Sequence, residues 1–208
     1  MFFIRKTESL RSPWNKGRII GQKPPLKPKH VWAIRTRLQM DEKWRDLAMF
    51  NVGIDSKLRG CDLVTLRLED IAPQGLSIDR ATVMQRKTGR PVTFEISEYA
   101  RSAVTRYLAA LSADNQNYLF PSRGRPEQPI STRQYARLVS IWVESIGLDP
   151  RRYGTHSIRR TKAALIYKKI GNLRAVQLLL GHSKIESTVK YLGIEVDDAI
   201  ELAERIDI

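Results

Sequence analysis

Apolar residues recur at helical spacing near the start of the chain. Val31, Ile34 and Leu38 lie three or four positions apart, which predicts a helix that ends near Met40. Asp41 follows, and a short acidic side chain at such a point is typical of a helix N-cap. The pattern therefore predicts two successive helices, with Asp41 capping the second.

A break follows the second predicted helix. Residues 55–63 read Asp-Ser-Lys-Leu-Arg-Gly-Cys-Asp-Leu, and a short helical turn is expected to end near Leu66. Arg59 lies at this junction. A long cationic side chain can project there from a rigid corner.

A different pattern between residues 78 and 96 predicts a small sheet. Residues 81–84 and 92–94 are typical of strands because they are rich in β-branched side chains. The link, residues 87–91, reads Lys-Thr-Gly-Arg-Pro and is typical of a turn. We therefore expect an antiparallel hairpin with Lys87 at its turn.

Helices are expected again after the hairpin. Ser97, Ser131 and Thr155 are suited to be N-caps, and the helix after Ser131 is expected to stop at Gly147. The predicted fold class is mainly α with a small antiparallel β-sheet (α+β), as in the catalytic domain of the family named below. The last part of the chain is expected to be helical in pieces, separated by Gly154, Gly171, Gly181 and Gly193.

The net charge of the chain indicates which class of molecule it binds. The chain has 36 Lys and Arg against 22 Asp and Glu, a formal charge of +14. This balance indicates a polyanionic partner, nucleic acid before an anionic membrane surface. A basic protein without such a partner is the open alternative, because net charge concerns association and not fold.

Cysteine content and hydropathy exclude several classes of protein. The single cysteine, Cys61, excludes an internal disulfide framework and a thiolate zinc site. The apolar start, residues 1–4, is too short for a signal peptide. No apolar run approaches the roughly 20 residues that span a bilayer. We expect a soluble cytoplasmic protein with no membrane partner.

The composition divides the chain once. Residues 1–29 form a basic arm interrupted by prolines, and residues 30–208 are expected to form one domain. Such an arm suits three roles that the sequence leaves open. The arm could follow a phosphate backbone or cover the folded domain, and it could equally be a disordered tail.

Missing motifs restrict the chemistry. The chain has no G-x-x-x-x-G-K-[ST] loop, no H-E-x-x-H, no Cys-His zinc spacing and no tight acidic cluster. No cofactor and no metal are therefore expected. Chemistry on a phosphodiester would then use side chains alone: cations for the non-bridging oxygens, an in-line nucleophile and an acid for the leaving oxygen.

Residues suited to these roles gather near the C-terminus. His156 and Arg159 would project about 60° apart on a helix and can share one anion. His182 could donate a hydrogen bond to phosphate. Tyr191 would lie roughly 120° from the apolar stripe of residues 185–192, and its phenol could act as a nucleophile. The simpler alternatives are a solvated basic face, a histidine bonded to a backbone carbonyl, and a surface tyrosine.

Taken together and in order, these residues resemble the tyrosine recombinases, the phage-integrase family of site-specific DNA strand-exchange enzymes. The catalytic domain of that family has an arginine in T-G-L-R-x-x-E-L, a lysine on a hairpin, H-x-L-R-H, L-G-H and then a tyrosine. The resemblance extends from about Pro28 to the C-terminus. The matching segments are Ser56 to Leu63 with Leu66 and Asp70-Ile71 after it, Gln85 to Arg90, His156 to Arg160, Leu180 to His182, and Ile185, Thr188 and Tyr191.

The resemblance implies a role for each residue on the phosphate. Arg59 and Arg159 would hold the scissile phosphate, and His182 would support it. No metal and no ATP are implied, because a covalent protein–DNA link conserves the bond energy.

The resemblance also implies the nucleophile and the proton carriers. Tyr191 would attack phosphorus to give a 3′-phosphotyrosyl link. Lys87 would protonate the leaving 5′ oxygen, and His156 would act as acid and base. The partner would be double-stranded DNA, bound by a dimer or tetramer whose protomers exchange a C-terminal helix. Residues 195–208 are the expected donor, and packing within the same chain is the alternative.

The chain departs from the family pattern at three positions. Lys57 stands where the family has glycine, Asp62 stands where it has glutamate, and Arg160 replaces the second histidine of H-x-L-R-H. Most members also carry a helical core-binding domain of about a hundred residues, for which residues 1–208 leave no room, so the chain resembles either the short single-domain invertases of the family or an isolated catalytic domain. Two other functions stay open: an inactive or accessory DNA-binding protein of the same fold, and a type IB topoisomerase-like strand-relaxing enzyme.

Overall fold

The computed structural model describes residues 21–111, 117–193 and 204. This part of the chain is mainly helical with one two-stranded antiparallel sheet, which confirms the predicted fold class. In chain order the elements are α1 (Pro28–Met40), α2 (Trp44–Ser56), α3 (Gly60–Val64), α4 (Leu68–Ile71), η1 (Pro73–Gly75), β1 (Arg80–Met84), β2 (Pro91–Glu95), α5 (Glu98–Ala109), α6 (Thr132–Glu144), α7 (Thr155–Ile170), α8 (Leu173–Leu180) and α9 (Ile185–Leu192).

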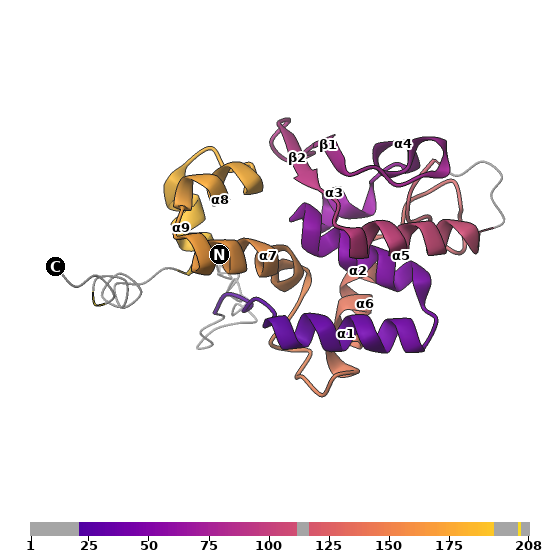
Figure 1. The fold of residues 1–208 in the computed structure, drawn as a ribbon, viewed down its shortest axis with the longest axis horizontal. Helices are drawn as coiled ribbons and strands as arrows, with labels where there is room; N and C mark the ends of the chain where they lie inside the picture. The colour runs from indigo at the N-terminus through magenta and orange to yellow at the C-terminus, as the bar shows by residue number, and fades with distance from the viewer. Residues whose placement is uncertain (1–20, 112–116, 194–203, 205–208) are drawn as a thin grey trace, which may run out of the picture.

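The helix α2 lies at the centre of the part of the molecule built on the larger hydrophobic core, which we call the larger body. Every residue from Leu47 to Ser56 is buried, because the run Leu-Ala-Met-Phe-Asn-Val-Gly-Ile presents apolar side chains on all sides. The helices α1, α5 and α7 pack around it (Figure 1). The C-terminal end of α2 therefore reaches the point where the larger body meets α7.

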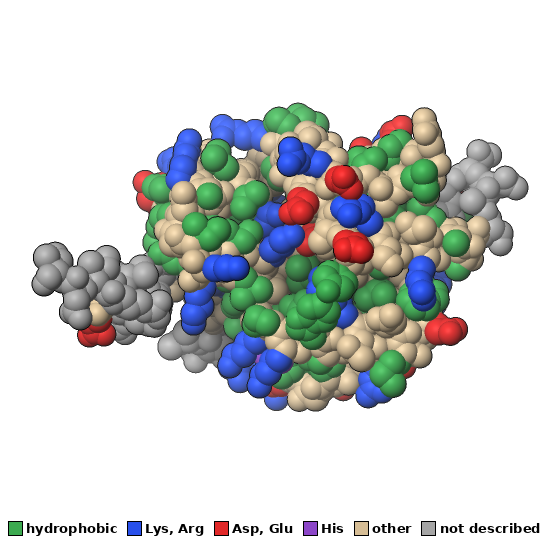
Figure 2. Space-filling model, in the orientation of Figure 1, with side chains coloured by type: hydrophobic (Ala, Val, Ile, Leu, Met, Phe, Trp, Pro, Cys, Tyr) green, Lys and Arg blue, Asp and Glu red, His purple; other side chains and the backbone are tan. Residues whose placement is uncertain are grey.

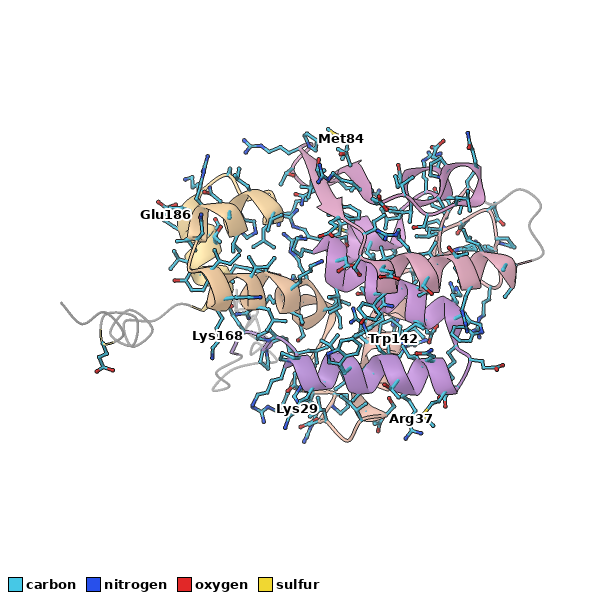
Figure 3. All side chains as sticks on the ribbon, viewed as in Figure 1. Lys29, Arg37, Met84, Trp142, Lys168 and Glu186 are labelled. Carbon is cyan, nitrogen blue, oxygen red and sulfur yellow. The ribbon has the colours of Figure 1, made fainter. Side chains whose placement is uncertain are left out.

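Aromatic residues of α6 fill the core beside α2. Trp142 is 1% exposed and packs edge to face on Phe50, with 5.7 Å between the ring centroids. Its indole nitrogen donates to the Asp46 carboxylate at 3.0 Å, so the buried polar atom is satisfied. Figure 3 labels Trp142 between α1 and α5.

The hairpin is confirmed. Arg80 pairs with Glu95 and Met84 pairs with Pro91. Along each strand, exposed residues alternate with buried ones, as the period of two requires for a sheet with one face on the core. Met84, which Figure 3 labels at the outer edge of the molecule, is exposed.

The start of α2 differs from the prediction. Asp41 is the residue that ends α1, and Lys43 is the one that precedes α2. Glu42 between them has a φ of 51°, so the chain needs two further residues to turn before α2 begins. The carboxylate of Asp41 pairs with Lys43 at 2.9 Å instead of capping a helix.

The predicted ends of the later helices are partly confirmed. Ser131 caps α6, with its Oγ accepting from the Gln134 N–H at 3.1 Å. Gly147, with a φ of 76°, closes the turn that follows α6. The prediction for Thr155 is wrong, because Gly154 is the cap of α7 and its N–H donates to the Ser157 hydroxyl at 3.2 Å.

The last three helices form a second, smaller cluster. Ala163 of α7 packs with Val176 and Leu180 of α8, and Tyr191 and Leu192 of α9 lie against them. In Figure 1 these helices lie side by side at one end of the molecule. The candidate site residues are divided between this cluster and the larger body.

The chain before α1 lies against α7. Leu26 is 2% exposed, and its N–H donates to the Thr161 hydroxyl at 3.0 Å. The rest of the predicted arm, residues 1–20, and the predicted exchanged segment, apart from residue 204, lie outside the described residues. No helix in the described ranges is long and apolar enough to cross a membrane.

Candidate active site

The corner after α2 aims Arg59. Lys57 has φ 53° and ψ 24°, the left-handed conformation that glycine adopts without penalty. Arg59 then has extended backbone and precedes α3, with its side chain half-buried. The lysine in this chain thus takes the backbone conformation that suits the glycine of the family pattern.

The Lys57 side chain is buried and bonds a backbone carbonyl of the same corner. Its side chain is 3% exposed, and its ammonium donates to the Asp55 carbonyl at 2.5 Å. The Asp55 carboxylate in turn bonds Lys162 at 2.6 Å and the Ser97 hydroxyl at 2.5 Å. Burial and then the Lys162 charge lower the pKa of Lys57, Asp55 opposes both, and the net result is a pKa of about 8.

Gln85 connects the two arginines of the site. Its Oε1 accepts from Arg59 Nη1 at 2.7 Å, and its Nε2 donates to the Leu180 carbonyl at 3.3 Å. Arg159 Nη2 donates to the same carbonyl at 3.1 Å. Gln85 is 1% exposed, so one buried amide holds in register two guanidinium groups from distant parts of the sequence.

Gly181 allows the hairpin to approach α8. Its φ is 67°, and a Cβ at this position would lie 2.7 Å from Val92 Cγ2 and 3.2 Å from Gln85 Nε2. Both the backbone conformation and the contact require glycine. The glycine of L-G-H is therefore the point where the α8–α9 turn meets the hairpin.

His182 is fixed on both sides. Its backbone N–H donates to the Gln177 carbonyl at 3.1 Å, and the Gln177 amide donates to the His182 carbonyl at 3.0 Å. Its Nδ1 lies 3.0 Å from the Thr188 hydroxyl. Burial, followed by the charges of Arg159 and Arg59, lowers the pKa of His182 to about 4. The ring is therefore neutral near pH 7, and when Thr188 donates to Nδ1 the ring proton is on Nε2.

Tyr191 lies inside this group. Its ring meets His182 edge to face, with 5.4 Å between centroids. The guanidinium carbons of Arg159 and Arg160 lie 5.6 Å and 5.4 Å from the ring centroid. Burial raises the pKa of Tyr191 to about 12, against the opposing charges of Arg159, Arg160 and Arg59.

The orientation of Tyr191 corrects the sequence prediction. The stripe through Ile185 was expected to be the inward side, with Tyr191 away from it. Ile185 is instead 40% exposed, and Thr188, one turn before Tyr191, is fully buried. The reason is that α9 packs across α7 and α8 through its Thr188 side, where His182 provides a polar partner.

Three polar atoms in this group, Arg160 Nε among them, have no hydrogen-bond partner within the described residues. Arg159 Nη1 and the Tyr191 hydroxyl are both buried without a hydrogen bond. Arg159 is 2% exposed, and burial is the main cause that lowers its pKa. Buried donors without partners are costly and mark places where a ligand can bind. An anion that reaches Arg159 Nη1 and the Tyr191 hydroxyl could accept a hydrogen bond from each.

The other two predicted residues lie at the edge of the group. His156 is exposed on the first turn of α7, and its pKa is lowered by partial burial and then by Arg159, Arg160 and Arg59. Lys87 is exposed in the hairpin turn and makes no ion pair within the described ranges. The structure thus joins Arg59 to Arg159 through Gln85 and the Leu180 carbonyl, and Arg159 and His182 both contact the Tyr191 ring. Lys87 lies outside this set of contacts.

Several residues that hold the site were not predicted from the sequence. Gln85 continues the inward alternation of Ala81 and Val83, and a polar residue at such a position is the signal that could have identified it. Gln177 similarly interrupts the apolar run of α8. Asp62, the shortened carboxylate, accepts from the Arg86 N–H at 2.9 Å and so supports the hairpin turn.

Basic side chains surround the site. Arg86, Lys87 and Arg90 in the hairpin turn are exposed, as are Lys184 and Lys190 around α9. In the view of Figure 2, Lys and Arg gather over the half that holds α7, α8 and α9 and at the start of α1. Within the described ranges, no three His, Cys, Asp or Glu side chains lie together in a way that could hold a metal ion.

Comparison with protein families identifies one match over most of the chain. A model described as the phage integrase family matches residues 26–196. Among curated proteins, the chain is 29% identical to tyrosine recombinase XerC of Caldanaerobacter subterraneus subsp. tengcongensis. That alignment covers 98% of this chain and 61% of the relative, so the chain spans less than two thirds of its length.

Solved structures show the same fold. A crystal structure of XerA recombinase has a TM-score of 0.71 and 21% sequence identity, and the match covers 89% of this chain and 66% of that one. A pre-cleavage complex of XerH site-specific recombinase with its difH substrate has a TM-score of 0.67 and 16% identity, over 88% and 55% of the two chains.

Proposed function

The chain belongs to the phage integrase family, and we propose that it is a tyrosine-type site-specific recombinase that cleaves and rejoins DNA strands through a 3′-phosphotyrosyl intermediate. The observation that carries this proposal is the unpartnered Tyr191 hydroxyl, buried beside His182 and the guanidinium groups of Arg159 and Arg160. A tyrosine so placed has a nucleophilic oxygen close to Arg159, a cation that can hold phosphate.

Arg59 and Arg159 hold the scissile phosphate in this proposal. Each guanidinium has one nitrogen tied to the Gln85–Leu180 link, which leaves further N–H groups for the non-bridging oxygens. Neutral His182 donates from Nε2 to the same phosphate. Charge that develops on phosphorus oxygens in the transition state thus meets donors already in place.

Cleavage forms the bond between the Tyr191 oxygen and phosphorus and breaks the bond between phosphorus and the 5′ oxygen. His156, whose lowered pKa leaves it neutral near pH 7, accepts the phenol proton. Lys87 protonates the departing 5′ oxygen when DNA brings the exposed hairpin turn over the phosphate. Rejoining is the reverse step with a new 5′ hydroxyl, so the phosphate ester energy is retained.

The proposed partner is double-stranded DNA, and the XerH complex is the structural relative that supports it. Strand exchange needs more than one protomer on DNA, so we propose a dimer or tetramer. Residues 195–208 are proposed to pass between protomers. Such an enzyme would work where the DNA lies, in the cytoplasm and nucleoid of a bacterial or phage-infected cell.

Covalent capture tests the proposal. A pool of nicked duplexes with randomised sequence is incubated with the protein, because a nick beside the cleavage site releases the 5′ hydroxyl fragment and traps the intermediate. Wild-type protein is expected to become attached to DNA through Tyr191 and to select a recognition sequence. The measurement is the covalent adduct on a denaturing gel, with sequencing of the captured DNA.

Tyr191→Phe is the decisive comparison. It removes the nucleophilic oxygen and leaves the ring contacts, so the adduct is expected to fall below detection while DNA binding is retained. Tyr167→Phe, on α7, is the matched control and is expected to behave as wild type. An adduct with Tyr191→Phe, or none with wild type, would contradict the proposal.

A further inference from the structure

Arg160 is a buried guanidinium that the roles above leave unused. It is 6% exposed, and its Nη1 donates to the Lys23 carbonyl at 2.8 Å. Its Nε is buried and has no hydrogen-bond partner among the described residues. No ion pair within these residues includes it. A guanidinium kept from water without a carboxylate is costly for folding.

The end of α9 accommodates this charge beside the nucleophile. The guanidinium carbon of Arg160 lies 5.4 Å from the Tyr191 ring centroid, within the range of a cation–π contact. Gly193 ends α9 with a φ of 69°, and a Cβ there would lie 3.4 Å from Arg160 Nη2. The guanidinium therefore occupies a space bounded by the tyrosine ring and the α9 terminus.

Residues 22–26, named here the strap, orient this arrangement from outside. The Lys23 carbonyl accepts from Arg160, and the Gln22 amide donates to the Lys190 carbonyl, the residue before Tyr191, at 2.7 Å. The strap thus connects Arg160 of α7 to Lys190 of α9.

We propose that Arg160, oriented by the strap, is a positioning residue for the Tyr191 nucleophile. The inference rests on the proposed function. In the cleavage step the Tyr191 oxygen gains phosphorus and loses its proton to a base, and the 5′ oxygen loses phosphorus and gains a proton. Arg160 acts on the tyrosine alone, because its charge favours the deprotonated phenol and its contact fixes the ring.

The electrostatic setting of the phenol is consistent with this role. The charged or titratable groups around it are Arg159 and Arg160 on α7, Arg59 from the α2–α3 corner and His182 from the α8–α9 turn. Burial raises the pKa of the phenol, and the three arginines oppose that effect. Removal of one of them makes deprotonation harder.

The test uses the captured DNA with sulfur in place of the bridging 5′ oxygen. Such a substrate needs no proton on its leaving group, so the pH dependence reports on the nucleophile. Arg160→Met is expected to slow adduct formation about tenfold near neutral pH, equivalent to about one unit in the phenol pKa, and to move the profile to higher pH. Arg160→Lys is expected to restore part of the rate.

Controls separate this role from a structural one. Arg137→Met removes an exposed arginine of α6 and is expected to leave the rate unchanged. An Arg160→Met rate equal to wild type, or a loss without any pH shift, would overturn the inference. If Arg160→Met does not fold, the rates of Arg160→Lys and Gln22→Ala are compared with wild type instead. Wild-type rates in both variants would overturn the inference. Failure of wild type to form any adduct concerns the proposed function instead.

Discussion

At the scale of single residues, Lys57 combines two unfavourable features in one position. A non-glycine residue in the left-handed region costs about 1 kcal/mol or more, and a nearly buried ammonium adds a desolvation cost. The bonds around Asp55 offset part of both. This corner precedes Arg59, so the chain retains a costly lysine where it aims a site residue.

Lys57→Met is predicted to alter the pH dependence of stability. Below about pH 8 the folded and unfolded chains both carry the ammonium, so the cost of burying it is fully present. From about 8 up to the ordinary value of 10.5 the folded chain releases the proton first. The free energy of unfolding of wild type should therefore rise by about 3 kcal/mol relative to Lys57→Met as the pH increases.

Urea denaturation of both proteins at several pH values measures this difference. Lys168→Met removes an exposed lysine of α7 and should give a curve parallel to wild type. Parallel curves for wild type and Lys57→Met would show that the buried ammonium keeps an ordinary pKa.

Gln85 is predicted to matter more for cleavage than for binding. Gln85→Met keeps the side-chain length and removes the bonds to Arg59 and the Leu180 carbonyl. Because small displacements of a clamping group cost about a hundredfold in rate, adduct formation should fall by about that factor while DNA affinity changes little. Gln134→Met, exposed on α6, is the matched control, and equal rates for both variants would contradict the prediction.

At the scale of elements, the glycines that end α7 and α8 have different tasks. Gly171 and Gly181 have similar φ values of 71° and 67°, but only the Gly181 position lies against other residues. Substitutions at these two positions therefore distinguish the cost of the backbone conformation from the cost of contact between the hairpin and the α8–α9 turn.

Gly171→Ala is predicted to reduce the free energy of unfolding by about 1 kcal/mol, the cost of a left-handed alanine. Gly181→Ala should lose about 1 to 3 kcal/mol more, because its Cβ would overlap Val92 and Gln85. Thermal or urea unfolding of the two variants measures the difference. Equal losses would mean that the hairpin moves away at no cost.

At the scale of the whole molecule, the site lies where two packed units meet. Arg59 comes from the larger body and Arg159, His182 and Tyr191 come from the α7–α9 end, with the hairpin Gln85 between them. The basic surface around the same end attracts a polyanion to this region. Site assembly and anion attraction are thus properties of the same region.

The charge of +14 predicts steep salt dependence of DNA binding. If the protein neutralises about 6 to 10 phosphates, affinity for duplex DNA should fall on the order of a thousandfold or more between about 50 and 200 mM salt, through counterion release. Fluorescence anisotropy with a labelled duplex measures the slope. A flat dependence would argue against DNA as the main partner.

The amino-acid sequence by itself determined the fold class and most of the elements, and it supplied the residue types from which the candidate site is built. Helix and strand periodicities are local, so the hairpin, the later helices and the order of the motifs were all predictable. Tertiary structure decided the rest. The inward side of α9 is set by α7 and α8, which is why the orientation of Tyr191 was mispredicted. The contacts of Gln85, the burial of Lys57 and the placement of Arg160 also depend on segments distant in sequence, because packing, not periodicity, chooses which polar groups meet.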